Sequence, residues 1–189
     1  MIRETLSFLR DQINSYLKNK LEIPQNMVVL DNVISQSGEL NATELGLSLI
    51  NIEEEKIHKT QSPYKIAGNG TVNLVNPEIK LNLYLLFIAN FGTGNYEDAL
   101  GALSHVIRFF QGRQVFTRQN APTLNEHIEK LIIELVTLSF EQQNHLWGFI
   151  GAKYIPSVLY KVRLLSMADE ATLQEVHTLS GINTNLSLL

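Results

Sequence analysis

The stretch that decides the fold is Ile79-Lys80-Leu81-Asn82-Leu83-Tyr84-Leu85-Leu86-Phe87-Ile88. Apolar residues occupy every second position from Ile79 to Phe87, which is the period of a β-strand with one buried face. In the second half, Leu86 and Ile88 add apolar side chains to the opposite face. A strand that is apolar on both faces is typical of the interior of a covered sheet. We therefore predict a central strand over residues 79–88.

The segment before it predicts a second strand with an irregularity. Leu45, Leu47 and Leu49 alternate with small or polar residues. Ile50 and Ile52 then move the apolar positions to the opposite face. Such a change of phase indicates a β-bulge or a strand that is buried on both sides.

Three further segments are interpreted as strands. Residues 27–34 are rich in β-forming residues, and residues 158–164 alternate in a long last strand. Residues 128–138 fit both a helix and a strand. Because Ser139-Phe140-Glu141-Gln142 matches a capping box, a new helix begins there, and we favour a strand for the residues before it.

Helices are predicted both before and after the central strand in the sequence. Apolar residues recur at steps of three or four from residue 2 to residue 17, and Pro24 ends this helix. A second helix covers Tyr96–Gln111, with Asn95 as its N-cap and Gly112 as its C-terminal stop. Strands and helices without regular βα repetition predict an α+β fold, with a mixed, mostly antiparallel sheet flanked by helices.

The domain organisation contains one long excursion and a tail. Residues 53–76 break the strand pattern, and Asn69-Gly70 is a strong turn signal between Tyr64–Ala67 and Val72–Val75, which we interpret as a small hairpin. We expect a single domain over residues 1–168. Residues 169–189 are weakly patterned and are interpreted as a tail that serves as an interaction segment.

The composition narrows the class of protein. Of 189 residues, 44% are hydrophobic and 18% are charged, which is the balance of a globular chain. With no cysteine, disulfides, thiolate metal sites and a cysteine nucleophile are excluded. The net charge of −4 argues against a broad phosphate-binding surface. Neither a membrane span nor a signal peptide is apparent, so we expect a cytoplasmic protein.

Motifs for catalysis and cofactors are incomplete in the sequence. Gly92-Thr93-Gly94 precedes a helix, but Glu97 stands where a dinucleotide-binding loop needs a small residue. The five histidines include no pair at the i, i+4 spacing of a zinc site. Glu53-Glu54-Glu55 lacks the alternate-residue spacing of a calcium loop and fits a solvated charge run. We therefore predict no catalytic residue, no metal site and no cofactor.

One basic cluster allows two interpretations. Arg108, Arg113 and Arg118 lie near several aromatic residues. Such a combination can bind single-stranded nucleic acid. On a net-acidic chain it fits docking to an acidic protein surface equally well.

A more specific pattern is Trp147-Gly148-Phe149-Ile150-Gly151-Ala152-Lys153-Tyr154-Ile155-Pro156-Ser157-Val158-Leu159-Tyr160-Lys161-Val162-Arg163. It resembles the C-terminal signature of the cap, or tail-terminator, proteins of phage-tail-like contractile injection systems, of the N-terminal-domain type. In that family a tryptophan helix leads through glycine and tyrosine into Pro-Ser-Val-x-Tyr and a basic alternating strand. Residues 77–86 and 96–122 resemble the family in the same order, so the resemblance covers roughly residues 1–168.

The signature residues are expected to have structural roles. They are Trp147, Gly151, Tyr154, Pro156, Ser157 and Tyr160. Gly151 permits a sharp reversal of the chain, and Pro156 fixes the backbone that enters the last strand. We expect Trp147 and Tyr154 to pack across this corner, each using its polar atom for one hydrogen bond.

The resemblance implies a structural cap, not an enzyme, that ends the inner tube and the sheath away from the baseplate. The implied partners are further copies of the chain in a hexameric ring, the tube protein and the sheath protein, without nucleic acid or a membrane span. Assembly in the cytoplasm would precede incorporation into the particle. The residues that we predict to contact partners are Glu53, Glu54, Glu55, Arg113, Arg118, Lys161 and Arg163. Reversing the charges of both Arg113 and Arg118 is expected to weaken docking more than folding.

Two other classes stay open on the sequence alone. One is a monomeric adaptor or ligand-binding domain. The other is a small enzyme assembled from scattered Glu, Asp and His residues. A ring, or association with tube protein, would distinguish a cap from both.

Overall fold

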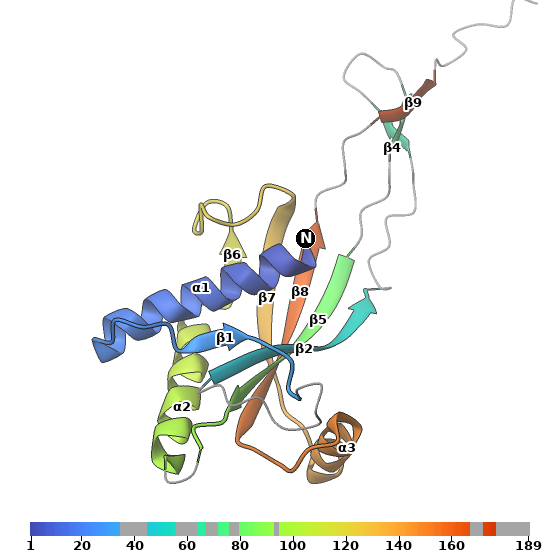
Figure 1. Ribbon diagram of the computed structural model, residues 1–189. Coiled ribbons are helices and arrows are strands. Elements are labelled where there is room, and N and C mark those ends of the chain that lie inside the picture. Colours follow the sequence, from blue (N-terminus) through green and yellow to red (C-terminus); the bar gives the residue numbers. More distant parts are fainter. Residues whose placement is uncertain are drawn as a thin grey trace, which may run out of the picture.

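The computed structural model describes residues 1–34, 45–55, 64–66, 72–75, 80–92, 95–166 and 172–176. Its centre is a six-stranded sheet with the strand order β1-β2-β5-β8-β7-β6 (Figure 1). These strands span Val28–Leu30 (β1), Leu45–Glu54 (β2), Lys80–Ala89 (β5), Ser157–Ser166 (β8), Ile128–Val136 (β7) and Val115–Thr117 (β6). β1 and β2 are parallel, whereas the other neighbouring pairs are antiparallel. The predicted α+β class with a mixed, mostly antiparallel sheet is confirmed.

Helices cover the two faces of this sheet unequally (Figure 1). Helices α1 (Ile2–Leu21) and α2 (Tyr96–Gly112) bury their apolar sides against one face and form the main core with it. Helix α3 (Phe140–Ile150) packs on the opposite face, where a smaller cluster surrounds Trp147. We call the face that carries α3 the outer face.

Strand β5 has the central place that its two apolar faces predicted. It pairs with β2 on one side and with β8 on the other. Leu83, Leu85 and Phe87 belong to the main core, whereas Leu86 and Ile88 belong to the cluster under α3. All five side chains are buried. The last long strand of the main sheet, β8, pairs with β5 along its length, and α2 contacts β5.

Strand β2 contains the predicted bulge. Leu49 lies opposite Leu85 and Asn51 lies opposite Tyr84, so Ile50 is the extra residue. Because side chains alternate along a strand, one extra residue moves all later side chains to the other face. Glu53 consequently lies opposite Asn82 on the outer face, whereas the leucines before the bulge face the main core.

The ambiguous segment is a strand, as favoured, and α3 begins with the expected capping box. Ser139 Oγ accepts a hydrogen bond from Gln142 N at 3.2 Å, and Gln142 Oε1 accepts one from Ser139 N at 2.9 Å. The three-residue strand β6 was not predicted, because it is too short to show a period. β1 is likewise shorter than the predicted 27–34.

The ends of α2 differ in detail from the prediction. Asn95 makes no side-chain bond to the helix and instead donates to Phe91 O at 3.3 Å. The helix ends at Gly112, but the backbone N–H of Arg113 closes it by donating to the carbonyls of Phe109 and Phe110. Asn95 therefore stands at the predicted N-cap position but forms no side-chain cap, and the helix ends at Gly112 as predicted, with Arg113 as the C-cap residue.

A second, three-stranded sheet contains the excursion. Its strands are β3 (Tyr64–Ile66), β4 (Val72–Val75) and β9 (Thr172–Val176), in the order β3-β4-β9 and antiparallel throughout. The predicted hairpin is confirmed, although its turn at Asn69-Gly70 lies outside the described residues. In Figure 1, β4 and β9 lie beyond the side of the main sheet where β5 begins and β8 ends. The predicted tail thus contributes a strand to the excursion.

Candidate interaction surfaces

All the signature residues except Tyr160 form the corner between α3 and β8. Gly151 has φ 76°, a left-handed conformation that glycine adopts without strain, and its N–H donates to Trp147 O at 3.0 Å. The chain thereby reverses directly after α3. The rings of Trp147 and Tyr154 meet edge to face with centroids 5.8 Å apart, which confirms that they pack across the corner.

Pro156 and Ser157 join this corner to the centre of the sheet. The carbonyl of Pro156 accepts a hydrogen bond from Ala89 N at 3.0 Å, and Ser157 lies opposite Ile88. A proline can supply this carbonyl although it has no N–H of its own. The beginning of β8 is therefore fixed to the end of β5, as the expected role of Pro156 requires.

The hydrogen-bond part of this prediction is wrong for Trp147. Its side chain is only 4% exposed, and its Nε1–H is buried without an acceptor among the described residues. An unpaired buried donor costs stability, so Trp147 holds α3 on the sheet by apolar contact alone. Tyr154 is 58% exposed and lies at the rim of the corner.

Tyr160 belongs to the main core and not to the corner. Its ring centroid lies 4.7 Å from that of Phe110 and 5.9 Å from that of Phe87. Burial raises the pKa of the Tyr160 hydroxyl from its usual value near 10 to about 12.

This shift predicts a stability change at high pH. An unfolded tyrosine ionises near pH 10 and native Tyr160 only near pH 12, so the native state keeps its proton longer. Stability should be intact below about pH 10 and should fall as the pH rises toward about 12. Urea melts at about pH 9 and about pH 11 should show this loss in the wild type and less of it in Tyr160→Phe. Tyr154→Phe, at an exposed tyrosine, should retain the wild-type loss, and equal losses in all three proteins would contradict the assignment.

Half of the outer face is not covered by α3 and carries polar side chains. We call this surface the open half; its residues include Glu53, Asn82, Tyr84, Lys161 and Arg163. Tyr84 donates its hydroxyl hydrogen to Glu53 Oε2 at 2.9 Å. Burial, and then the bond to Glu53, raise the pKa of Tyr84. The cross-strand register places Lys161 opposite Tyr84, and Arg163 opposite Asn82.

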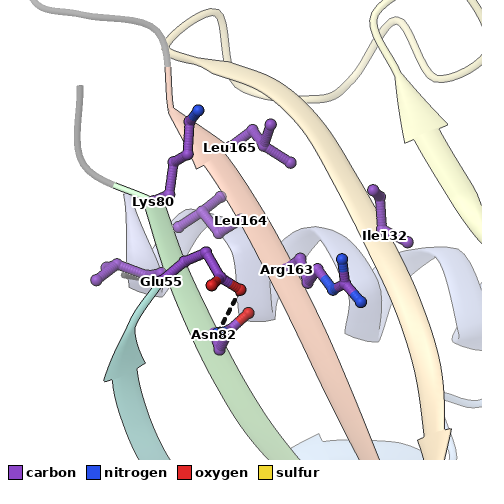
Figure 2. A pocket seen from close by; sticks show the side chains of 8 residues that line it. Glu55, Lys80, Asn82, Ile132, Arg163, Leu164 and Leu165 are labelled. Carbon is purple, nitrogen blue, oxygen red and sulfur yellow. Dashed lines mark hydrogen bonds between the residues drawn. The ribbon is translucent and has the colours of Figure 1, made fainter. Parts of the chain in front are cut away.

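A hollow of about 190 Å³ lies within the open half (Figure 2). Asn82 Nδ2 donates to Glu55 Oε2 at 3.2 Å on the side of β2, and Arg163 extends toward β7. There Arg163 Nη2 lies 2.9 Å from Oε1 of Glu134. The Oδ1 atom of Asn82 is buried without a partner among the described residues. The hollow thus lies between an acidic strand edge and a basic strand, and this pattern suits contact with a charged protein surface.

The predicted interface residues fall into three separate places. Glu53, Glu55, Lys161 and Arg163 share the open half, whereas Glu54 lies opposite Leu81 and points to the other face. The structure therefore brings together four of the seven residues, although Glu53 and Glu55 lie more than one hundred positions from Lys161 and Arg163 in the sequence.

The other two predicted arginines, Arg113 and Arg118, lie near β6 at the other side of the sheet. Both make contacts with groups of the same chain. The Arg113 guanidinium carbon lies 4.9 Å from the centroid of the Phe116 ring, and Nη1 donates to Gln12 Oε1 at 3.3 Å. Arg118 Nη2 donates to Glu126 O at 2.7 Å. The expectation that charge reversal at Arg113 and Arg118 weakens docking more than folding treated both residues as exposed charges with little part in stability. Arg113 is half-buried, so this premise is wrong for Arg113.

Asparagine side chains close both outermost strands. Asn14 of α1 donates from Nδ2 to Val28 O at 2.9 Å, and its Oδ1 accepts from Val28 N at 2.8 Å. At the far side, Asn120 donates to Val115 O and accepts from Thr117 N, both at 2.9 Å. Each amide occupies backbone groups that an adjoining strand would otherwise use. The sheet is therefore closed to extension at β1 and at β6.

Sequence reasoning missed these caps and the polar centre of the open half. A cap such as Asn14 leaves no sequence signal, because it depends on which strand the helix packs against. Asn82 and Tyr84 did carry a signal: they are polar residues on the second face of the most apolar strand. Polar side chains at such positions mark the part of a face that no helix covers.

The described residues contain neither a metal-binding group nor a membrane-spanning helix. In these ranges, no three His, Cys, Asp or Glu side chains come together as metal ligands. Among the described helices, none is long and apolar enough to cross a membrane.

Comparisons with known proteins agree on one type of fold. The sequence profile of the Pvc16 N-terminal domain matches residues 4–178. The chain superposes on the PVC sheath/tube terminator of an extracellular contractile injection system in its extended state, with a TM-score of 0.59, 14% identity and 100% of this chain covered. It also superposes on the anti-feeding prophage tube-terminating cap, with a TM-score of 0.58, 15% identity and 93% coverage. No curated protein sequence matches the chain.

The two solved proteins are longer than the part that this chain matches. The chain covers 65% of the sheath/tube terminator and 59% of the tube-terminating cap. The profile match includes β9, so the family domain extends beyond residue 168. The matches confirm the tail-terminator resemblance that the signature indicated.

Proposed function

Because the chain belongs to the Pvc16 N-terminal domain family, we propose that it is a tail terminator of a contractile injection system. It caps the tube and sheath at the end distal to the baseplate and stops the addition of further subunits. The observation that carries this proposal is that the whole chain shares its fold with a sheath/tube terminator. The cap of the anti-feeding prophage, matched over 93% of the chain, supports the same function.

The closed sheet edges supply a physical reason why the fold suits this task. A growing tube or sheath end presents a surface that the next subunit can bind, and a terminator must bind it without offering a copy. Asn14 and Asn120 occupy the backbone groups at the two outermost strands. Further strands therefore gain few hydrogen bonds there, and association is directed to other surfaces.

The partners in this proposal are proteins. The chain forms a ring of six copies that matches the symmetry of the tube, and the ring contacts tube and sheath protein. It acts without catalysis, cofactor or nucleic acid, assembles in the cytoplasm and then remains in the particle. The open half, with Glu53, Glu55, Lys161 and Arg163, is the contact surface that the charge pattern favours.

Deletion of the gene tests the function directly. Baseplates, tube protein and sheath protein should still be made, while tails become unstable or variable in length because nothing stops their distal ends. Electron micrographs of particles from the deletion strain, and from the same strain with the gene restored, measure the length distribution. Tails that keep a normal, uniform length and a capped end without the gene would exclude the terminator function and favour an adaptor.

A further inference from the structure

One part of the main sheet has an open edge. β1 pairs with β2 only as far as Leu47, opposite Leu30. Among the described strands, β5 alone pairs with β2 beyond that point. The outermost strands are closed by Asn14 and Asn120, so β2 differs from both.

The backbone of Ile52 points out of this edge. Glu55 N donates to Lys80 O of β5 at 2.8 Å, and backbone groups alternate in direction along an antiparallel strand. The N–H and C=O of Ile52 therefore point away from β5. The N–H is held only by Oδ1 of the adjacent Asn51, at 2.9 Å, and no described group donates to the carbonyl. This single local bond can be exchanged for strand pairing.

The side chains around Ile52 define the chemistry of an added strand. Ile52 is 44% exposed, although it is apolar. Glu53 lies on the outer face and Glu54 on the other, so carboxylates flank the edge on both faces of the sheet. An added strand with basic side chains would meet acidic neighbours on either face, and one apolar residue could cover Ile52.

We propose that the edge of β2 around Ile52 accepts an extended, basic segment of a partner protein as an additional strand. Main-chain hydrogen bonds to Ile52 provide the pairing, and Glu53 and Glu54 select the basic partner. The inference rests on the proposed function only in taking the partner to be a protein of the assembly. The edge itself can be tested without that assembly.

The test uses the full chain and a capped eight-residue peptide in which pairs of lysines alternate with pairs of valines, so that each face of the added strand carries both residue types. The peptide should bind, and hydrogen exchange measured by NMR should show new protection of the Ile52 amide. A peptide with N-methyl groups on alternate residues has the same charge but cannot pair as a strand, and should bind at least about tenfold more weakly. A glutamate-valine peptide should not bind.

Variants of the protein separate pairing from charge. Glu53→Lys with Glu54→Lys should weaken binding by about tenfold or more at low salt, whereas Glu126→Lys with Glu129→Lys, an equal reversal at another exposed site, should change it little. Asn51→Ala exposes the Ile52 amide and should keep or strengthen binding. No binding, or equal binding of the N-methylated peptide, overturns the proposal.

The outcome is distinguishable from failure of the terminator function. If the peptide pairs with β2 while the gene deletion leaves uniform, capped tails, the edge is a strand acceptor and the terminator function is wrong. If the deletion disturbs tail length while the peptide does not pair, the strand-acceptor proposal alone is wrong.

Discussion

Replacing Trp147 by alanine is expected to lower the free energy of unfolding by about 3–5 kcal/mol. Trp147 is the only fully buried side chain of α3, whose residues are all described. It packs with Leu86, Ile88 and Leu159 in the cluster on the outer face. Because α3 has no second buried anchor, the loss of the indole should also loosen the helix. Urea melts of the purified variant measure the change.

Two variants at the same helix act as controls for this prediction. Phe149→Ala removes an aromatic ring that is 84% exposed, and it should change stability by less than about 0.5 kcal/mol. Trp147→Phe keeps an aromatic ring and removes the buried N–H, which finds no acceptor in the described part of the chain, so it should cost much less than alanine. If the alanine variants of Trp147 and Phe149 melted alike, Trp147 would be exposed in solution.

Replacing Asn14 by alanine is expected to cost about 3 kcal/mol, because buried backbone groups lose their partners. The Asn14 side chain is 3% exposed and makes three hydrogen bonds at the start of β1, to Met27 N, Val28 N and Val28 O. Without the amide, these groups are too deeply buried for water to replace every bond. The variant should also open the outer edge of β1.

Asn120→Ala is the matched control for this effect. Asn120 caps β6 with two hydrogen bonds of similar length, but its side chain is exposed. Water can replace it, so we expect a loss of about 1 kcal/mol or less by urea melts. Equal losses in the two variants would show that burial does not decide the cost of removing a strand cap.

The parts of the fold that could be predicted are those with a local period. The alternation in β5, the capping box at Ser139 and the change of phase at Ile50 were sufficient for the central strand, α3 and the bulge. The parallel pairing of β1 with β2 left no local signal, because it joins segments that are separated in the chain. The three residues of β6 were too few to show a period.

The candidate site was predictable by residue type but not by place. Glutamates, lysine and arginines were selected as charged residues of exposed segments. That Glu53 and Arg163 would share one face follows from the bulge and from the pairing of β2, β5 and β8. Arg113 looked like a free charge, yet it contacts the Phe116 ring and Gln12, which lies about a hundred positions earlier. Contacts of this range follow from the packing of α1, α2 and β6.

The bulge at Ile50 divides β2 into two halves in which substitutions should have different effects. Residues before it, such as Leu47, contact the main core, and substitutions there should change stability. Residues after it, such as Glu53, line the surface and should change recognition instead. Because distant effects add nearly independently, the second half can diverge toward new partners while the first half keeps the domain folded. One inserted residue thus separates the positions that set stability from those that set recognition within a single strand.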